Sequence, residues 1–192
     1  ELVRIMEKYP WCNGVDIDLE KGDDYSTHAV STAMFKHIYE TVKAYDSTKE
    51  MNICLPGMTS VNGSVGGENW CVYGDLDKYC DTASIMSYGM AWAGSAPGPV
   101  SPRSWLEGIY DYATQVMNPD KVFLGMPAYG WNWQIYDTPE NLGKYYRGTS
   151  HTYYAAKYWM QGLYNFTDDA PPQPFIPIVS YWDDYDMGPW AL

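Results

Sequence analysis

Hydrophobic and polar residues alternate along the chain with periods that predict a succession of helices and strands. Apolar positions spaced three and four residues apart indicate amphipathic helices, whereas a period of two indicates strands. The predicted helices cover residues 1–9, 28–45, 73–79 and 102–117. The predicted strands cover residues 14–20, 51–56, 81–89 and 121–130. From residue 131 the chain is polar, aromatic and irregular, and it becomes β-rich over 174–182.

The order strand, helix, strand, helix is typical of an α/β fold with a parallel sheet. Prolines support the helix boundaries, because Pro10 ends the first helix and Pro102 begins the last one. Polar or glycine-rich loops follow the C-terminal ends of several strands, where α/β proteins build their sites. Sequential right-handed crossovers predict that the four strands are neighbours in chain order. The pattern is compatible both with a barrel and with an open sheet.

The strand over 14–20 is unusual because acidic residues occupy every second position. Its two faces carry Val15, Ile17 and Leu19 on one side and Asp16, Asp18 and Glu20 on the other. Because strands of a parallel sheet are usually covered on both sides, we expect the carboxyl groups to face a covered interior. Repulsion and desolvation there favour one carboxyl remaining protonated, as a general acid requires. The alternatives are a solvated charged face or a site for a hard divalent cation.

Composition narrows the class of ligand. The 192 residues include 12 Lys and Arg against 24 Asp and Glu, a net charge of -12, which disfavours nucleic acid as a partner. No apolar stretch is long enough to span a membrane. The chain has 19 Tyr and 9 Trp but 4 Phe, and flat rings with polar edges suit sugar rings. Ordinary burial of tyrosine in a core is the alternative interpretation.

The four cysteines lack the spacing of a zinc site. Cys71 and Cys80 are close enough in the sequence to bridge a loop, and the pattern leaves this disulfide open. Cys12 and Cys54 lie in apolar segments, which predicts buried thiols.

Several motifs together resemble a known enzyme family. NGVDIDLE (13–20) resembles the signature strand of the family 18 glycoside hydrolases, which include chitinases and endo-β-N-acetylglucosaminidases. IMSYG (85–89) resembles the family's strand ending in Met-x-Tyr, and KVFLGMPAYGWNW (121–133) resembles its seventh strand. FIPIVSYWDDYD (175–186) resembles the end of the α+β insertion that follows. Residues 92–133 look most like the spore-cortex and cell-wall-lytic branch.

The resemblance implies a (β/α)8 TIM barrel, of which this chain supplies a part. The expected division is a partial barrel of about strands 4–7 over 1–130, an α+β insertion over 131–186 and a return towards the barrel over 187–192. A complete barrel needs about 250 residues. We therefore expect another segment or another chain to supply the remaining strands, and an exposed apolar sheet edge where they are missing.

The resemblance also implies hydrolysis with retention, in which the substrate's own 2-acetamido oxygen attacks the anomeric carbon. Glu20 matches the general acid/base, and Asp18 matches the carboxylate that orients the acetamido group. Asp16 matches the buried partner that shares a proton with Asp18. Tyr88 matches the tyrosine whose hydroxyl holds the acetamido carbonyl, and we expect it to lie near Asp18 and Glu20.

Other positions match the substrate-binding surface of the family. Met86 matches the floor of the acetamido pocket, and Tyr129 matches a tyrosine that lines the substrate. Loop tryptophans that either stack on sugars or pack internally are Trp92, Trp131 and Trp133. The resemblance implies neither a cofactor nor a metal. Gly89 departs from the family, because many members carry Asp, Asn or Glu after the tyrosine.

Together these features predict a glycosidase that cleaves β-1,4 bonds of an N-acetylglucosamine-containing polysaccharide, either peptidoglycan or chitin. We expect an extracellular, cell-wall-associated or virion-associated protein with no nucleic-acid partner and no membrane span. The alternative is a carbohydrate-binding or structural module of a phage tail or of a spore or cell-wall assembly, with weak or no catalysis. Glu20 favours the enzyme, because binding-only relatives commonly lose that residue.

Overall fold

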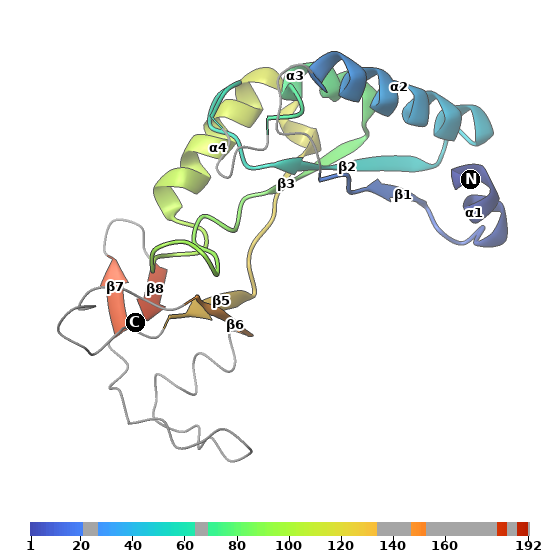
Figure 1. The fold of residues 1–192 in the computed structure, drawn as a ribbon. Coiled ribbons are helices and arrows are strands. Elements are labelled where there is room, and N and C mark those ends of the chain that lie inside the picture. Colours follow the sequence, from blue (N-terminus) through green and yellow to red (C-terminus); the bar gives the residue numbers. More distant parts are fainter. Residues whose placement is uncertain (21–26, 64–68, 134–146, 153–179, 184–187, 192) are drawn as a thin grey trace. The chain divides into compact units, whose positions relative to one another are not determined.

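The structure is a computed structural model that describes residues 1–20, 27–63, 69–133, 147–152, 180–183 and 188–191 (Figure 1). The chain forms two compact units. The first unit comprises Glu1–Ser87 with Trp105–Gly125, and the second comprises Tyr88–Ser104 with Met126–Leu192. No described helix is both long and apolar enough to cross a membrane.

Helices and parallel strands alternate in the first unit. Its helices are α1 (Leu2–Lys8), α2 (His28–Tyr45), α3 (Tyr73–Leu76) and most of α4 (Arg103–Val116), with 3-10 turns η2 (Asp77–Tyr79) and η3 (Pro119–Lys121). Its strands are β1 (Gly14–Ile17), β2 (Glu50–Pro56), β3 (Thr82–Met86) and β4 (Val122–Leu124).

The four strands form one parallel sheet in the order β1-β2-β3-β4. Consecutive strands are neighbours, as expected when each crossover is right-handed and covered by the helix that follows its strand. The predicted parallel α/β sheet and its strand order are confirmed. Strand β4 lies at the edge of this sheet, and its Phe123, paired with Ser84, is 55% exposed. The expected apolar edge stays a prediction.

The core of the first unit lies between the sheet and helices α2, α3 and α4, which cover the same face (Figure 1). Apolar side chains at alternate strand positions are buried there, namely Ile17, Met51, Ile53, Leu55, Ala83 and Ile85. Tyr73 joins α3 to the end of β2, because its hydroxyl donates to the Pro56 carbonyl and accepts from the Met58 amide. Burial raises the pKa of this phenol, so it stays a donor.

A glycine allows β1 to begin close beside β2. A Cβ atom at Gly14 would collide with the backbone carbonyl of Glu50. The Glu50 amide also donates to the Asn13 carbonyl, at 2.9 Å, immediately before β1 begins. The absence of a side chain at Gly14 therefore brings the acidic strand into register with its neighbour.

Two antiparallel strand pairs belong to the second unit. Strand β5 (Tyr129–Asn132) pairs with β6 (Thr149–Thr152), and β7 (Ser180–Asp183) pairs with β8 (Gly188–Ala191). The loop over 88–104 is tied to this unit by the Gly148 amide, which donates to the Ala93 carbonyl at 2.7 Å. Much of the predicted insertion lies outside the described residues, so the proposed domain boundaries stay predictions.

Three predicted strands differ from the observed ones. The acidic strand ends at Ile17 rather than at residue 20, and the strand predicted over 81–89 ends at Met86. The strand predicted over 121–130 is two strands, β4 and β5, in different sheets. Pro127 lies between them and has no amide hydrogen to donate. Alternation shows which face a residue takes, but the length of a strand depends on the partner beside it.

The expectations for the cysteines need correction. None of the four cysteines forms a disulfide, which answers the open question about Cys71 and Cys80; both of these side chains are buried. Cys12 is exposed rather than buried, because it lies in the connection between α1 and β1. Cys54 is half-buried on β2.

The buried face of the sheet predicts a position-dependent loss of stability. Replacing Ile53, which is 0% exposed, by Ala should lower the free energy of unfolding by about 2–5 kcal/mol, because a cavity remains. The same substitution at Ile5, which is 45% exposed, should change it by less than about 0.5 kcal/mol. Urea unfolding followed by circular dichroism measures both; equal losses would contradict this description of the core.

Candidate active site

The predicted site residues form two groups, one in each unit. The acidic residues and Met86 belong to the first unit. The aromatic residues belong to the second unit, and they are Tyr88, Trp92, Tyr129, Trp131 and Trp133. The prediction that Tyr88 lies near Asp18 and Glu20 stays a prediction.

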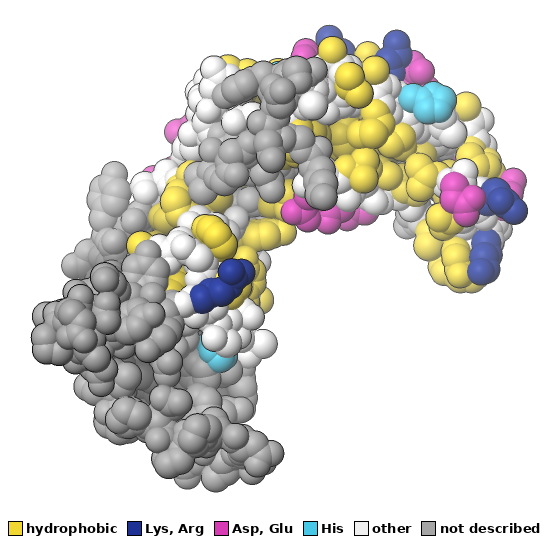
Figure 2. Space-filling model, viewed as in Figure 1, with side chains coloured by type: hydrophobic (Ala, Val, Ile, Leu, Met, Phe, Trp, Pro, Cys, Tyr) yellow, Lys and Arg dark blue, Asp and Glu magenta, His cyan; other side chains and the backbone are white. Residues whose placement is uncertain are grey.

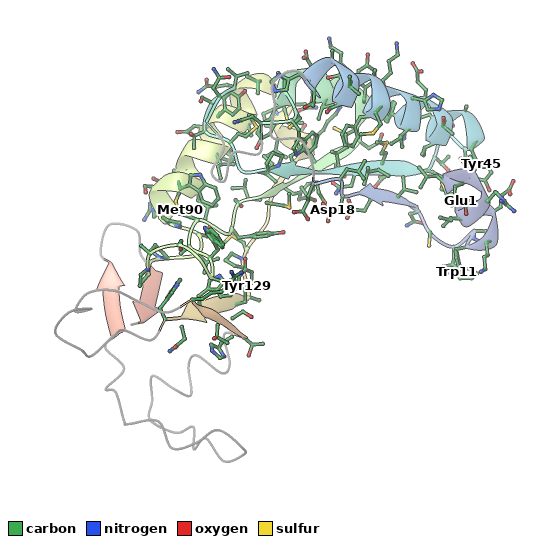
Figure 3. The ribbon with its side chains drawn as sticks, in the orientation of Figure 1. Glu1, Trp11, Asp18, Tyr45, Met90 and Tyr129 are labelled. Atoms are coloured by element: carbon green, nitrogen blue, oxygen red, sulfur yellow. The ribbon has the colours of Figure 1, made fainter. Side chains whose placement is uncertain are left out.

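The acidic residues lie on the face of the sheet opposite to the helices. We call this side of the first unit the polar face; its strand residues are Asp16, Asn52, Cys54, Thr82, Ser84 and Met86. Figure 3 places Asp18 on the side of the sheet away from α2. Figure 2 shows acidic side chains gathered on the same side. The polar face is the direct consequence of burying the alternate residues under the helices.

The carboxylates of the motif are open to solvent. Asp16, Asp18 and Glu20 are all exposed, so the expectation that they face a covered interior is wrong for this structure. The helices of the first unit cover the other face, and the polar face remains free of them (Figure 1). Exposed carboxylates at the C-terminal end of a parallel strand are accessible to a ligand, and this is the edge where barrel enzymes bind substrate.

The pKa of the Cys54 thiol reflects the negative charges on the polar face. Burial, followed by the charge and hydrogen bond of Asp16, raises the pKa of the Cys54 thiol to about 12. The charges of Asp18 and Glu20 contribute in the same direction. All three carboxylates of the motif therefore act on one thiol, which places their charges around the same part of the polar face.

Asp16 receives two hydrogen bonds from β2. The Asn52 amide nitrogen donates to Asp16 Oδ1 at 2.7 Å, and the Cys54 thiol donates to the same oxygen at 3.4 Å. Sequence reasoning missed these partners, although both were visible as polar residues alternating with buried apolar ones. Thr82 and Ser84 show the same pattern on β3. Polar residues at every second position of strands that were predicted to be buried were the sign that one face of the sheet is polar.

Met86 is the last residue of β3 and is half-buried. It lies on the polar face because it is two and four residues beyond Ser84 and Thr82. This position agrees with its predicted place at the floor of a pocket, which itself stays a prediction.

Three of the five aromatic residues contact one another. The Tyr88 and Tyr129 rings meet edge to face with centroids 6.3 Å apart, and the Tyr129 and Trp131 rings do the same at 6.3 Å. Partial burial raises the pKa of the Tyr129 phenol, which keeps it protonated as a donor. Tyr88 is 37% exposed. An exposed tyrosine of this kind can stack its ring on a sugar and form a hydrogen bond to it through its hydroxyl group.

The two remaining tryptophans have opposite environments. Trp92 is 51% exposed, and a side chain at Gly94 would strike its ring. Trp133 is 2% exposed and lies against Gly148 in the same way. Exposure makes Trp92 available to a ligand, whereas Trp133 serves packing in this unit; their predicted roles in substrate binding are untested.

Gly89 follows Tyr88 with a positive φ of 88°. Residues with a side chain are strained in this left-handed region, at a cost of roughly 1–2 kcal/mol, whereas glycine is not. Glycine at this position, where many family members carry Asp, Asn or Glu, therefore suits the conformation of the local backbone. In the described part of the chain, no three His, Cys, Asp or Glu side chains are grouped to hold a metal ion.

The parallel α/β sheet with acidic residues following one strand defines a candidate glycoside hydrolase of the barrel type. The family model "Glycosyl hydrolases family 18" matches residues 1–188, and the chain belongs to this family. Family membership confirms the resemblance that the motifs indicated.

Relatives and solved structures agree with this assignment. A cortical fragment-lytic enzyme of Bacillus anthracis is 29% identical over 92 residues, which are 47% of this chain and 21% of that protein. The structure of YdhD from Bacillus subtilis, assigned as a sporulation-specific glycosylase, matches with a TM-score of 0.75 at 20% identity, over 99% of this chain and 57% of that one. A chitinase structure from Chromobacterium violaceum matches with a TM-score of 0.71 at 17% identity, over 98% of this chain and 51% of that one.

The chain thus spans about a fifth of that curated relative and about half of the solved structures. At these identities the structural matches show the fold alone, which is an α/β fold of the TIM-barrel type.

The electrostatics of the polar face predict a difference in thiol reactivity. At pH 8 iodoacetamide should modify exposed Cys12 readily and Cys54 slowly, because a thiol with a pKa of about 12 supplies little thiolate. Asp16→Asn removes a neighbouring charge and should lower the pKa of Cys54, which accelerates its alkylation. Peptide mass spectrometry measures both rates. An Asp16→Asn protein with an unchanged Cys54 rate would contradict the coupling.

Proposed function

We propose that this chain carries the acid/base machinery of a glycosidase that cleaves β-1,4 bonds after N-acetylglucosamine. The observation that carries the proposal is the cluster of three solvent-accessible carboxylates at the C-terminal end of β1, on the face opposite to the core. Membership of glycosyl hydrolases family 18 supports the same reaction class.

In the proposed reaction, Glu20 donates its proton to the glycosidic oxygen, and the bond between that oxygen and the anomeric carbon breaks. The carbonyl oxygen of the substrate's 2-acetamido group attacks the anomeric carbon from the other side and forms an oxazolinium ion. The Glu20 carboxylate then takes a proton from water as the water attacks the anomeric carbon. Two inversions retain the β configuration, and Glu20 regains its proton.

Asp18 is proposed to accept the acetamido N–H and to balance the positive charge of the oxazolinium ion. Asp16 is proposed to share a proton with Asp18. Tyr88 is proposed to donate its hydroxyl to the acetamido carbonyl, and Met86 is proposed to form the floor of the acetamido pocket. The mechanism needs no cofactor, because the nucleophile belongs to the substrate.

The aromatic residues of the second unit are proposed to bind the sugar chain. Tyr129 has an accessible ring and a protonated hydroxyl, and Trp92 is exposed on its loop. Trp131 contacts Tyr129 edge to face. Trp133 is buried, so its contribution would be to support the surface that carries Trp131.

We propose peptidoglycan rather than chitin as the substrate. A curated relative is a cortical fragment-lytic enzyme, and a matching structure is that of a spore cortex-lytic enzyme from Bacillus cereus. This substrate implies a cell-wall-associated protein outside the membrane. The same relatives support a barrel of which this chain contributes about strands 4–7, with an insertion after the seventh strand and the remaining strands supplied by another segment or chain. A binding module without turnover is disfavoured because Glu20 is retained.

Replacing the acid tests the proposal directly. Glu20→Gln keeps the size of the side chain but removes the transferable proton, so kcat should fall by about 10²–10⁴-fold while substrate binding is largely kept. Glu40→Gln is the matched control, because Glu40 forms an exposed pair with Lys36 on α2. Release of reducing ends from peptidoglycan and chitin, measured side by side with the full-length protein, gives both the loss and the substrate preference. Full activity of Glu20→Gln would overturn the mechanism.

The substrate-assisted route makes a second, independent prediction. The first product observed by proton NMR should be the β anomer, and a thiazoline analogue of the oxazolinium ion should inhibit. A substrate with a 2-hydroxyl in place of the acetamido group should turn over poorly, because it lacks the nucleophile. An initial α anomer would rule this mechanism out.

A further inference from the structure

A hydrogen-bond network crosses the polar face from β3 to β1. The Thr82 and Ser84 hydroxyls lie 2.9 Å and 3.2 Å from Asn52 Oδ1. On the other side, Asn52 Nδ2 donates to Asp16 Oδ1 at 2.7 Å. One amide in the middle strand therefore links two hydroxyls to a carboxylate of the catalytic motif.

The register of the sheet makes this arrangement specific. Asn52 is the partner of Asp16 in the β1–β2 pairing and of Thr82 in the β2–β3 pairing. Residues paired in register point to the same face, so all three side chains meet on the polar face. A hydroxyl can donate whereas an amide oxygen can only accept, and two hydroxyls directed at Oδ1 turn the Nδ2 donor towards Asp16.

We propose that Asn52, oriented by Thr82, is a positioning residue that holds the Asp16 carboxylate in place as a hydrogen-bond acceptor within the motif. This inference rests on the proposed function. Hydrogen bonds to a carboxylate favour its charged form, so the loss of a donor to Asp16 is expected to be visible in a titration of that carboxyl group.

Cys54 supports the same arrangement. Its thiol donates to Asp16 Oδ1 at 3.4 Å, and its raised pKa keeps the proton on sulfur. Among the described residues, the titratable groups acting on this thiol from the sheet face are Asp16, Asp18 and Glu20. The β3 partners in the network, Thr82 and Ser84, carry hydroxyls that do not titrate in this range.

The test compares substitutions that remove one donor each. Asn52→Leu should lower kcat by about 10- to 100-fold, the size expected for a lost hydrogen bond to a charged group, with little change in KM. In this variant, the acidic limb of the plot of kcat/KM against pH should shift to higher pH by about one unit. Thr82→Val should shift the limb in the same direction by less, and Thr82→Ser should restore the original profile because the hydroxyl is kept.

Thr114→Val is the matched control. The Thr114 hydroxyl donates to the Tyr110 carbonyl within α4, away from the polar face, so this variant should keep the normal profile. If Asn52→Leu does not fold, as judged by its thermal unfolding midpoint, the Thr82 pair carries the test. A titration of the Asp16 carboxyl by ¹³C NMR gives a readout independent of turnover, and it should shift to higher pH in Thr82→Val but not in Thr114→Val.

The outcomes separate this inference from the proposed function. The positioning role alone would be overturned by one combination of results. In it, Glu20→Gln loses activity, but the Asn52 and Thr82 variants keep the original pH profile and the original carboxyl titration. Full activity of Glu20→Gln would overturn the proposed function, and the carboxyl titration would still decide whether Asn52 and Thr82 position Asp16. An equal fall in activity in Thr82→Val and Thr82→Ser, with no shift of the acidic limb, would reduce the network to a structural role.

Discussion

Burial of one face of the parallel sheet against the helices controls the rest of the first unit. Ile53, Leu55 and Ile85 are 0% exposed on this face, and burying each such side chain contributes about 1.5–3 kcal/mol. Because side chains alternate along a strand, this burial turns Asn52 and Cys54 to the opposite side. The polar face is therefore held in place by the hydrophobic core behind it rather than by its own contacts.

Electrostatics on the polar face follow from that placement. Three acidic residues at one end of β1 would repel one another without compensation, and here the charge of Asp16 is met by donors from β2. Burial, reinforced by these negative charges, raises the pKa of the Cys54 thiol and makes it a poor nucleophile. A thiol that keeps its proton serves as a donor, so burial and charge assign Cys54 a supporting role beside the carboxylates.

The second unit meets a different physical requirement, because its described residues include several large aromatic rings. Edge-to-face contacts join Tyr88, Tyr129 and Trp131, and glycines leave room for bulkier rings. Gly148 lies against buried Trp133 at the start of the β5–β6 pairing, where a side chain would collide with the indole. Gly89 lets the chain turn with a positive φ directly after Tyr88. In the described part of this unit, glycines therefore make room for the aromatic rings.

The sequence by itself determined the parallel α/β sheet, its strand order and the family, because hydrophobic periodicity and the contiguous NGVDIDLE motif are local properties. It also pointed to Asp16, Asp18 and Glu20 as one group. Only the tertiary structure decided that β1 ends at Ile17, that the segment over 121–130 divides between two sheets, and that the cysteines form no disulfide. The network from Thr82 through Asn52 to Asp16 was equally hidden, because it joins residues 30 and 36 positions apart. Register between strands is set by long-range pairing, and no local pattern contains it.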